Sequence, residues 1–264
     1  METASQWGGT VVIRPGLLAF LGAVGPTERH AHHAIQIVHA AGELVLRDAS
    51  HAELTCRQAI IPAGEPHTIV HGTPHAVLLF LDPESVLSRQ LMVRGGPGCD
   101  TVAAWALLAA PLAGVPAPGN ASSSTAELAD AVDRIILALH GNPTLAGAIG
   151  RDEARHPAVE RALETLAQRL SATVRLSEVA RDVGWSLSRL SHVFTKQVGL
   201  PMRSYVLWLR LERAMTAVAT GASLTQAAHS AGFADSAHLT RVCRRMFGLA
   251  PSQITRGMQW RQDW

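Results

Sequence analysis

The sequence LSEVARDVGW at residues 176–185 returns 48 positions later as LTQAAHSAGF at residues 224–233. After a one-residue insertion, the match between the two copies resumes at an offset of 49. Each copy predicts a short helix, a tight turn at Gly184 or Gly232, and a second helix. A duplication of this kind indicates one supersecondary unit that is used twice.

The residue types in both copies suit a helix-turn-helix. Ala180 and Ala228 are small where two helices must approach each other closely, and the turn glycines can adopt a positive φ. Ser223 and Gln226 have the spacing of a capping box, which defines the start of a helix. Residues 201–220, between the copies, predict one helix of about 18 residues, or about 27 Å. A rigid spacer of this length suits two recognition helices in major grooves about 34 Å apart.

The run LSEVARDVGWSLSRLSHVFTKQVGLPMRSYVLWLRLERAM, followed by LTQAAHSAGFADSAHLTRVCRRMFGLAPSQ, resembles the DNA-binding domain of the AraC/XylS family over about 100 residues. His192 stands where the family often has Arg, and Leu239 and Cys243 replace usual Phe positions. The resemblance implies a transcription regulator, with an activator role expected, that binds double-stranded DNA as a homodimer and has RNA polymerase as a further partner.

The same resemblance implies which residues face DNA. They lie on the outer faces of the two recognition helices: Ser188, Arg189, Ser191, His192, Ala237, His238, Arg241, Arg244 and Arg245. Arg241 is the best candidate for direct readout, because a guanidinium can bond O6 and N7 of guanine together. For Ser191 and His238, a solvated surface position explains the residue equally well.

Charge is distributed unevenly along the chain. Residues 1–156 contain 9 basic and 14 acidic side chains, whereas residues 157–264 contain 14 basic and 7 acidic ones. A basic excess on a small domain is typical of binding to a phosphate backbone, although a solvated basic face has the same composition.

The first part of the chain predicts strands. Residues 10–81 hold short apolar runs separated by Gly, Pro and His, as expected for antiparallel strands in a sandwich or barrel. Residues 111–125 lack charge and predict a linker, and residues 126–141 predict an amphipathic helix that packs on its own domain or pairs with its copy. We therefore expect an all-β cupin-like sensor domain with helices (1–110), a linker with a dimerisation helix (111–156), and an all-α DNA-binding domain (157–264).

Two histidine-containing segments, RHAHHAIQIVHAAG at residues 29–42 and IIPAGEPH at residues 60–67, resemble the two motifs of a cupin barrel. The resemblance implies an effector pocket formed by His30, His32, Gln36 and His67. Cupins often bind a metal through such histidines and a Glu. Here Gln36 replaces the carboxylate and leaves three imidazoles, His30, His32 and His67, as ligands for zinc, nickel or copper.

Two classes of function follow from these features. The first is a regulator whose pocket senses an organic, polar effector; the alternative is a metal sensor or a cupin enzyme that uses the same histidines. No Ser-His-Asp order, phosphate loop or paired-carboxylate motif supports another chemistry, so we expect a protein that is not an enzyme. Three dispersed cysteines argue against a disulfide framework. The lack of a secretory signal and of a long apolar stretch predicts a cytoplasmic protein.

Overall fold

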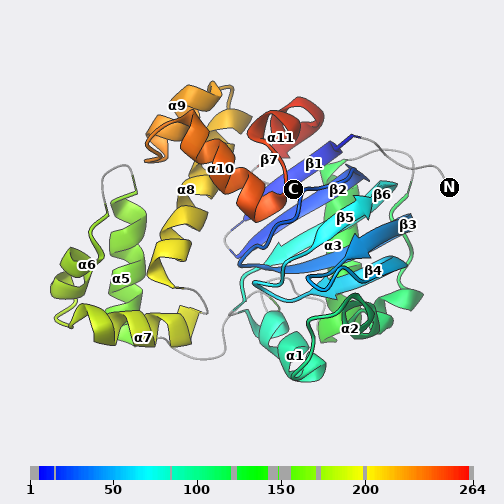
Figure 1. The fold of residues 1–264 in the computed structure, drawn as a ribbon, viewed down its shortest axis with the longest axis horizontal. Helices are drawn as coiled ribbons and strands as arrows, with labels where there is room; N and C mark the ends of the chain where they lie inside the picture. The colour runs from blue at the N-terminus through cyan, green and yellow to red at the C-terminus, as the bar shows by residue number, and fades with distance from the viewer. Residues whose placement is uncertain are drawn as a thin grey trace. The chain divides into compact units, whose positions relative to one another are not determined.

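The computed structural model describes residues 6–14, 16–83, 85–119, 124–141, 148, 156–170, 174–198 and 201–261. Its contacts divide the chain into two compact units (Figure 1). The sheet unit comprises residues 1–151 and 244–264, and the helical unit comprises residues 152–243. No described helix combines the length and hydrophobicity needed to cross a lipid bilayer.

The sheet unit is built on one seven-stranded sheet. Its strands are β1 (Gly8–Arg14), β2 (Leu17–Val24), β3 (Ile35–Arg47), β4 (Glu53–Ile61), β5 (Thr68–His71), β6 (Thr73–Leu81) and β7 (Met258–Arg261). They follow the order β4-β3-β6-β2-β1-β7, and β5 pairs with β3. Neighbours are antiparallel except β7, which pairs in parallel with β1 although it comes from the far end of the sequence.

Both faces of the central strands are buried. In β2, Leu17, Ala19 and Leu21 pack into one hydrophobic core, and the alternating Leu18 and Phe20 pack into the other. Successive side chains of a strand point to opposite faces, so a strand between two cores is apolar at every position. This explains the continuous runs LLAFL and AVLLFL.

Helices cover one face of this sheet. They are α1 (Val86–Gly95), the 3-10 helix η1 (Ala110–Gly114) and α3 (Thr125–His140). Val102 and Trp105 of α2 (Val102–Leu108) pack into the core on the other face, and α11 (Pro251–Gly257) leads into β7. In Figure 1, α3 lies behind the strands. Gly141, the last residue of the predicted amphipathic helix, ends α3 with a φ of 75°. The expected linker, residues 111–125, contains most of η1. Within the expected segment 111–156, residues 120–123, 142–147 and 149–155 lie outside the described part of the chain.

The apolar face of α3 is buried within its own unit. Leu128, Val132, Ile135, Ile136 and Leu139 are each 0–1% exposed and belong to the core that includes the sheet. The face is therefore not available to a partner subunit. The expectation that it forms a dimer interface is wrong, because burial against the subunit's own sheet already satisfies the amphipathic pattern. A homodimer through another surface stays a prediction.

The helical unit has its own core. It contains α5 (Pro157–Gln168), α6 (Leu176–Asp182), α7 (Leu187–Val198), α8 (Met202–Ala219), α9 (Leu224–Ser230) and most of α10 (Ser236–Phe247). The expected helix between the two repeats is α8, with 18 residues. The predicted fold class, an all-β region with helices followed by an all-α region, is confirmed. The predicted domain boundaries stay predictions.

Candidate functional site

Two helix-turn-helix units stand where the repeat predicted them: α6 with α7, and α9 with α10. The turn glycines have positive φ values of 73° at Gly184 and 81° at Gly232, as expected. The predicted capping box is present, because the Ser223 hydroxyl accepts the backbone N–H of Gln226 and the Gln226 side chain accepts the backbone N–H of Ser223. Local sequence therefore determines both turns and the start of α9.

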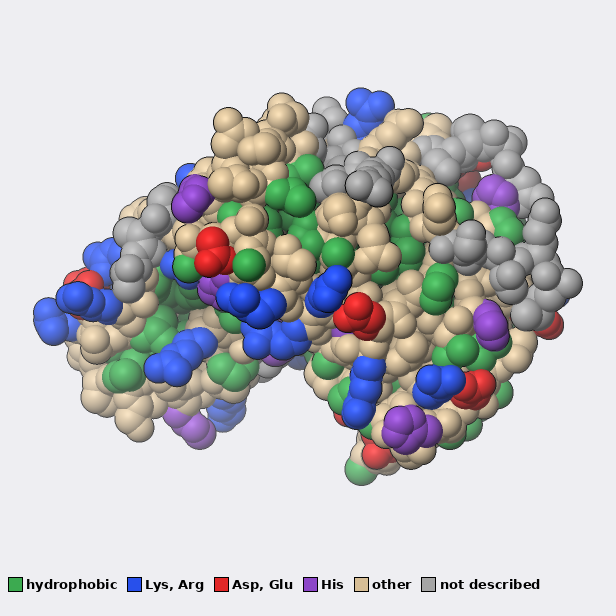
Figure 2. Space-filling model, turned by 45° about the horizontal axis from the view of Figure 1, so that its top comes forward, with side chains coloured by type: hydrophobic (Ala, Val, Ile, Leu, Met, Phe, Trp, Pro, Cys, Tyr) green, Lys and Arg blue, Asp and Glu red, His purple; other side chains and the backbone are tan. Residues whose placement is uncertain are grey.

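The two recognition helices, α7 and α10, present most of the predicted DNA-facing residues to solvent. Exposed side chains are Ser188, Arg189, His192, Ala237, Arg241, Arg244 and Arg245, whereas Ser191 and His238 are half-buried. On the face shown in Figure 2, Lys and Arg side chains gather over the helical unit, with Asp and Glu scattered between them. Contact with DNA stays a prediction for each of these residues.

Sequence reasoning did not find the aromatic partners of these side chains. The guanidinium carbon of Arg189 lies 4.3 Å from the centre of the Trp185 ring, and the His156 ring lies 4.6 Å from the same ring. In the second unit, the centre of the His238 ring lies 5.2 Å from the centre of the Phe233 ring, and the two rings are nearly perpendicular. Each aromatic residue directly follows a turn glycine, and this spacing was the available signal. A cation over an indole face is stabilised and restricted in orientation.

The end of α10 contacts the loop that precedes β3. The Arg244 guanidinium lies 3.9 Å from the Glu28 carboxylate, and the carbonyl of Arg245 accepts the backbone N–H of Ala31 at 3.1 Å. Both arginines belong to the sheet unit by their contacts. The exposed Arg244–Glu28 pair contributes little to stability, so Arg244 is free to exchange this partner for another anion.

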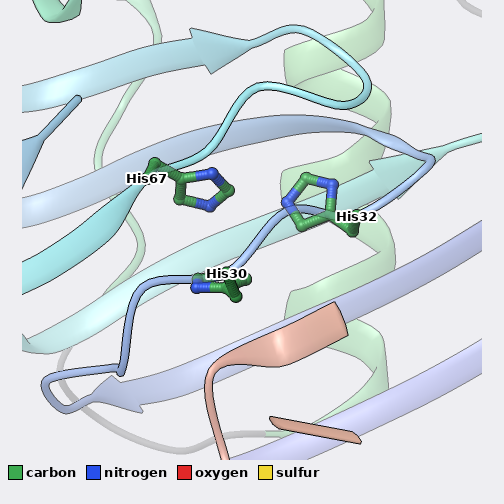
Figure 3. Close-up of side chains that lie close together, drawn as sticks. All are labelled: His30, His32 and His67. Carbon is green, nitrogen blue, oxygen red and sulfur yellow. The ribbon is translucent and has the colours of Figure 1, made fainter. Parts of the chain in front are cut away.

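The structure brings the predicted pocket histidines together. One ring nitrogen of each of His30, His32 and His67 lies within 4.8 Å of the others, and all three side chains are buried (Figure 3). A pair of backbone hydrogen bonds between His30 and His67 fixes the relative position of their two segments. Gln36, on β3, completes the cluster: its Oε1 lies 2.7 Å from Nε2 of His32 and 3.0 Å from Nε2 of His67.

Both ring nitrogens of His32 and of His67 face an oxygen that accepts hydrogen bonds. The Nδ1 atoms of His32 and His67 face the backbone carbonyls of Ala34 (2.8 Å) and Glu65 (2.9 Å), while their Nε2 atoms face Gln36. A neutral imidazole has one N–H and cannot donate to both sides. Protonation on Nδ1 leaves two Nε2 lone pairs that need either a cation or the N–H groups of a rotated Gln36 amide.

The histidines of the cluster are neutral at pH 7. Burial lowers the pKa of His30 to about 3, with a further contribution from the neighbouring His32. Burial also lowers the pKa of His32 and that of His67. Neutral imidazoles with their Nδ1 protons held by carbonyls have the form in which histidine binds metals through Nε2.

The donor set fits a divalent metal of the zinc type. Three imidazole nitrogens and one amide oxygen provide four neutral ligands. Nitrogens bound to one tetrahedral ion at about 2.1 Å would lie roughly 3.4 Å apart, so the rings would move inward from their spread of up to 4.8 Å. A bound metal would supply a Lewis acid at this point.

An apolar pocket lies beside the cluster, within the sheet unit. Of the four predicted effector residues, His30 and Gln36 line it, while His32 and His67 do not. The sequence did not predict its walls, which include Phe20 and Phe80 from the sheet and Phe247 from the end of α10. These residues are far apart in sequence, and no local pattern links them.

Comparison with known proteins identifies the helical part. A family model described as a helix-turn-helix domain matches residues 179–257. The HTH-type transcriptional activator RhaS of Escherichia fergusonii is 30% identical over 125 residues, which are 47% of this chain and 44% of RhaS. The HTH-type transcriptional regulator YbfI of Bacillus subtilis is 33% identical over 81 residues, 31% of this chain and 30% of YbfI. The chain thus spans less than half the length of these curated relatives.

A solved structure extends the likeness to the whole fold. Apo ToxT from Vibrio cholerae superposes with a TM-score of 0.54 over 93% of this chain and 99% of that chain, at 12% identity. ToxT with a bound unsaturated fatty acid superposes with a TM-score of 0.51 over 96% of this chain and 97% of that chain, at 11% identity. At these identities the likeness concerns the fold alone. The C-terminal helices are therefore a helix-turn-helix domain, and the chain as a whole has the two-part fold of ToxT.

Proposed function

We propose that this protein is a sequence-specific, DNA-binding transcription regulator and not an enzyme. The observation that carries the proposal is the pair of helix-turn-helix units with exposed polar and basic side chains on both recognition helices. The regulators among its relatives support the same function. A protein of this kind works in the cytoplasm, where it activates transcription through RNA polymerase.

Base contacts in this proposal come from the first turn of α7 and the second turn of α10. Arg189, which lies over Trp185, and Arg241 read base edges in the major groove, while Arg244 and Arg245 contact the phosphate backbone. The shorter side chains Ser188, Ser191, His192, Ala237 and His238 complete the two surfaces. The protein binds paired half-sites as a homodimer, through a surface other than the apolar face of α3.

Arg241→Ala tests the DNA-binding role. We expect a loss of about 1–3 kcal/mol on a duplex selected by the wild-type protein from a random pool, with relaxed preference at one base pair. Arg161→Ala, an exposed arginine of α5, serves as the matched control and changes binding little. Equal losses on selected and random duplexes would show that Arg241 contacts phosphate only. Failure of the wild-type protein to select any sequence would refute the proposal.

The sheet unit responds to a small organic effector. The pocket beside His30 and Gln36 supports this role. ToxT, which shares the fold, has been solved with an unsaturated fatty acid bound. A ligand that binds one conformation of a regulator better than another shifts the equilibrium between them.

A metal sensor is the second candidate, and the convergence of three imidazoles favours it. Metal content after dialysis, together with Co²⁺ absorption, would test it on wild-type protein, on a variant with His32→Ala and His67→Ala, and on the exposed control His71→Ala. Stoichiometric metal that is lost only from the double variant would support a metal sensor. Equal metal content in all three proteins would eliminate it.

A further inference from the structure

The apolar pocket of the sheet unit is partly open to solvent. All the residues that line it belong to this unit. Strand residues such as Val11, Phe20 and Leu78 form one wall. A second wall comes from the C-terminal segment, which contributes Ile254 and Met258. An apolar cavity with few polar groups is the usual form of a small-molecule site.

Polar groups are confined to three lining residues: Thr27, His30 and Gln36. The Thr27 hydroxyl accepts the backbone N–H of Ile69 at 2.9 Å and keeps its own proton to donate. Nδ1 of His30 lies 3.0 Å from the backbone carbonyl oxygen of Glu28, within hydrogen-bond distance. With the proton on Nδ1, the Nε2 of this neutral ring is an acceptor. The pocket therefore offers a hydroxyl donor at Thr27 and an imidazole acceptor at His30 for one polar group, beside the Gln36 amide.

The lining provides no charge to pair with an ionic ligand. No Lys, Arg, Asp or Glu is among the lining residues, all of which lie in the described part of the chain. An ionised carboxylate or ammonium would lose its hydration here without gaining a counter-ion, which is strongly unfavourable. A hydroxyl needs only the hydrogen bonds that the pocket provides.

We propose that this pocket binds an uncharged, largely apolar small molecule that carries one hydroxyl group. The inference rests on the effector role proposed above and specifies its ligand class. It replaces the expectation of a polar effector, because the sequence showed the histidines but not the apolar walls around them.

The test compares matched ligands on the full-length protein by calorimetry at pH 7.5. The probes are 4-ethylphenol and 1-hexanol, each against its carboxylate counterpart, 4-ethylbenzoate or hexanoate. A carboxylate must take up a proton to enter as a neutral group, and with a pKa near 4.5 this lowers its affinity about a thousandfold at pH 7.5. We expect at least one hydroxyl ligand to bind a hundredfold or more tighter than its counterpart. We also expect affinity for the carboxylate to rise about tenfold per pH unit lowered.

A variant in the pocket separates charge complementarity from general damage. Met258→Lys places a cation among the lining residues on a side chain of similar length, and we expect it to reverse the preference toward the carboxylate. Met258→Leu is the matched control and should keep the preference for the hydroxyl ligand.

Tighter carboxylate binding to the wild-type protein, no binding of either hydroxyl ligand at millimolar concentration, or an unchanged preference in Met258→Lys would each overturn the proposal. DNA binding is measured separately on the same proteins without ligand. If the wild-type protein does not distinguish selected from random DNA, the regulator function is refuted. The ligand class of the pocket is decided only by the preference between the hydroxyl and carboxylate ligands.

Discussion

The two turn glycines, which are equivalent in the repeat, should respond very differently to substitution by alanine. Gly184 and Gly232 have similar φ values of 73° and 81°. A Cβ on Gly184 would meet no atom within 4 Å, whereas a Cβ on Gly232 would lie 2.0 Å from the carbonyl oxygen of Leu170. The chemical change is the same at both positions, so the difference in cost isolates this close approach.

The expected magnitudes follow from backbone strain and overlap. A left-handed conformation costs an alanine about 1–2 kcal/mol, offset by about 0.4–1 kcal/mol from the lower entropy of its unfolded chain. Gly184→Ala should therefore cost about 1 kcal/mol. Gly232→Ala adds an overlap with backbone that only a movement of the turn can relieve, and it should cost more than about 3 kcal/mol.

Native-state hydrogen exchange of amides in the helical unit measures the two costs in the full-length protein. It reports the opening free energy of each region and does not require the two units to unfold together. Wild-type protein provides the reference for both variants. Similar losses in the two variants, or a greater loss in Gly184→Ala, would refute the reasoning.

Three further predictions concern the core, a buried carboxylate and a recognition helix. Ile135→Glu should unfold the sheet unit and not merely separate subunits, because it buries an unpaired charge in a core position that is 0% exposed; thermal melting and sedimentation would distinguish these results. Burial raises the pKa of Asp48, but its hydrogen bonds to Ser50, Val102 and Ala52 lower it more. The stability that the carboxylate contributes is therefore present above about pH 4 and lost as the pH falls further. Asp48→Asn should cost about 2 kcal/mol at pH 7, and the free energy of unfolding measured in urea should depend less on pH between about pH 3 and 5 than in the wild-type protein. Trp185→Leu should weaken DNA binding about as much as Arg189→Ala and non-additively with it, while Trp185→Phe restores part of the loss; additive effects in this double-mutant cycle would show that the ring does not position the guanidinium.

The helix-turn-helix units could be predicted because their determinants are local. A glycine at the turn, a small alanine at the helix contact and the Ser223–Gln226 cap all act within ten residues of one another. Each therefore leaves a signal in the sequence. The repeat doubled that signal.

The function of the amphipathic face of α3 could not be decided from its pattern. A stripe of Leu, Val and Ile at helical spacing satisfies burial against its own sheet or against a partner equally well. Burial against its own sheet is favoured only because the same unit has a sheet face that α3 can cover. That face was hidden in the sequence, because strands buried on both sides have no alternation of polar and apolar residues.

The pocket had no local signal at all. Its walls join strands near the start of the chain to residues near its end, and β7 is four residues long and pairs in parallel with β1. Parallel pairing of segments so distant in sequence has no turn or spacing that predicts it. The histidine motif marked only the polar end of the pocket, and the apolar walls had no counterpart in it.

The polar end of the pocket and the end of α10 are joined by backbone hydrogen bonds. The N–H of Glu28 donates to the carbonyl of Gly248 at 3.0 Å, and the N–H of Ala31 donates to that of Arg245 at 3.1 Å, on either side of His30. A Cβ on Gly248 would lie 2.5 Å from the Glu28 carbonyl oxygen, so the approach is close. A ligand that binds only this arrangement stabilises it by RT ln(1 + [L]/Kd), about 2.7 kcal/mol at a hundred times Kd. Because α10 begins in the helical unit, that free energy acts on the end of the helix that we propose reads DNA. By reciprocity, operator DNA that favours or disfavours this arrangement must change the affinity for the ligand by the same factor.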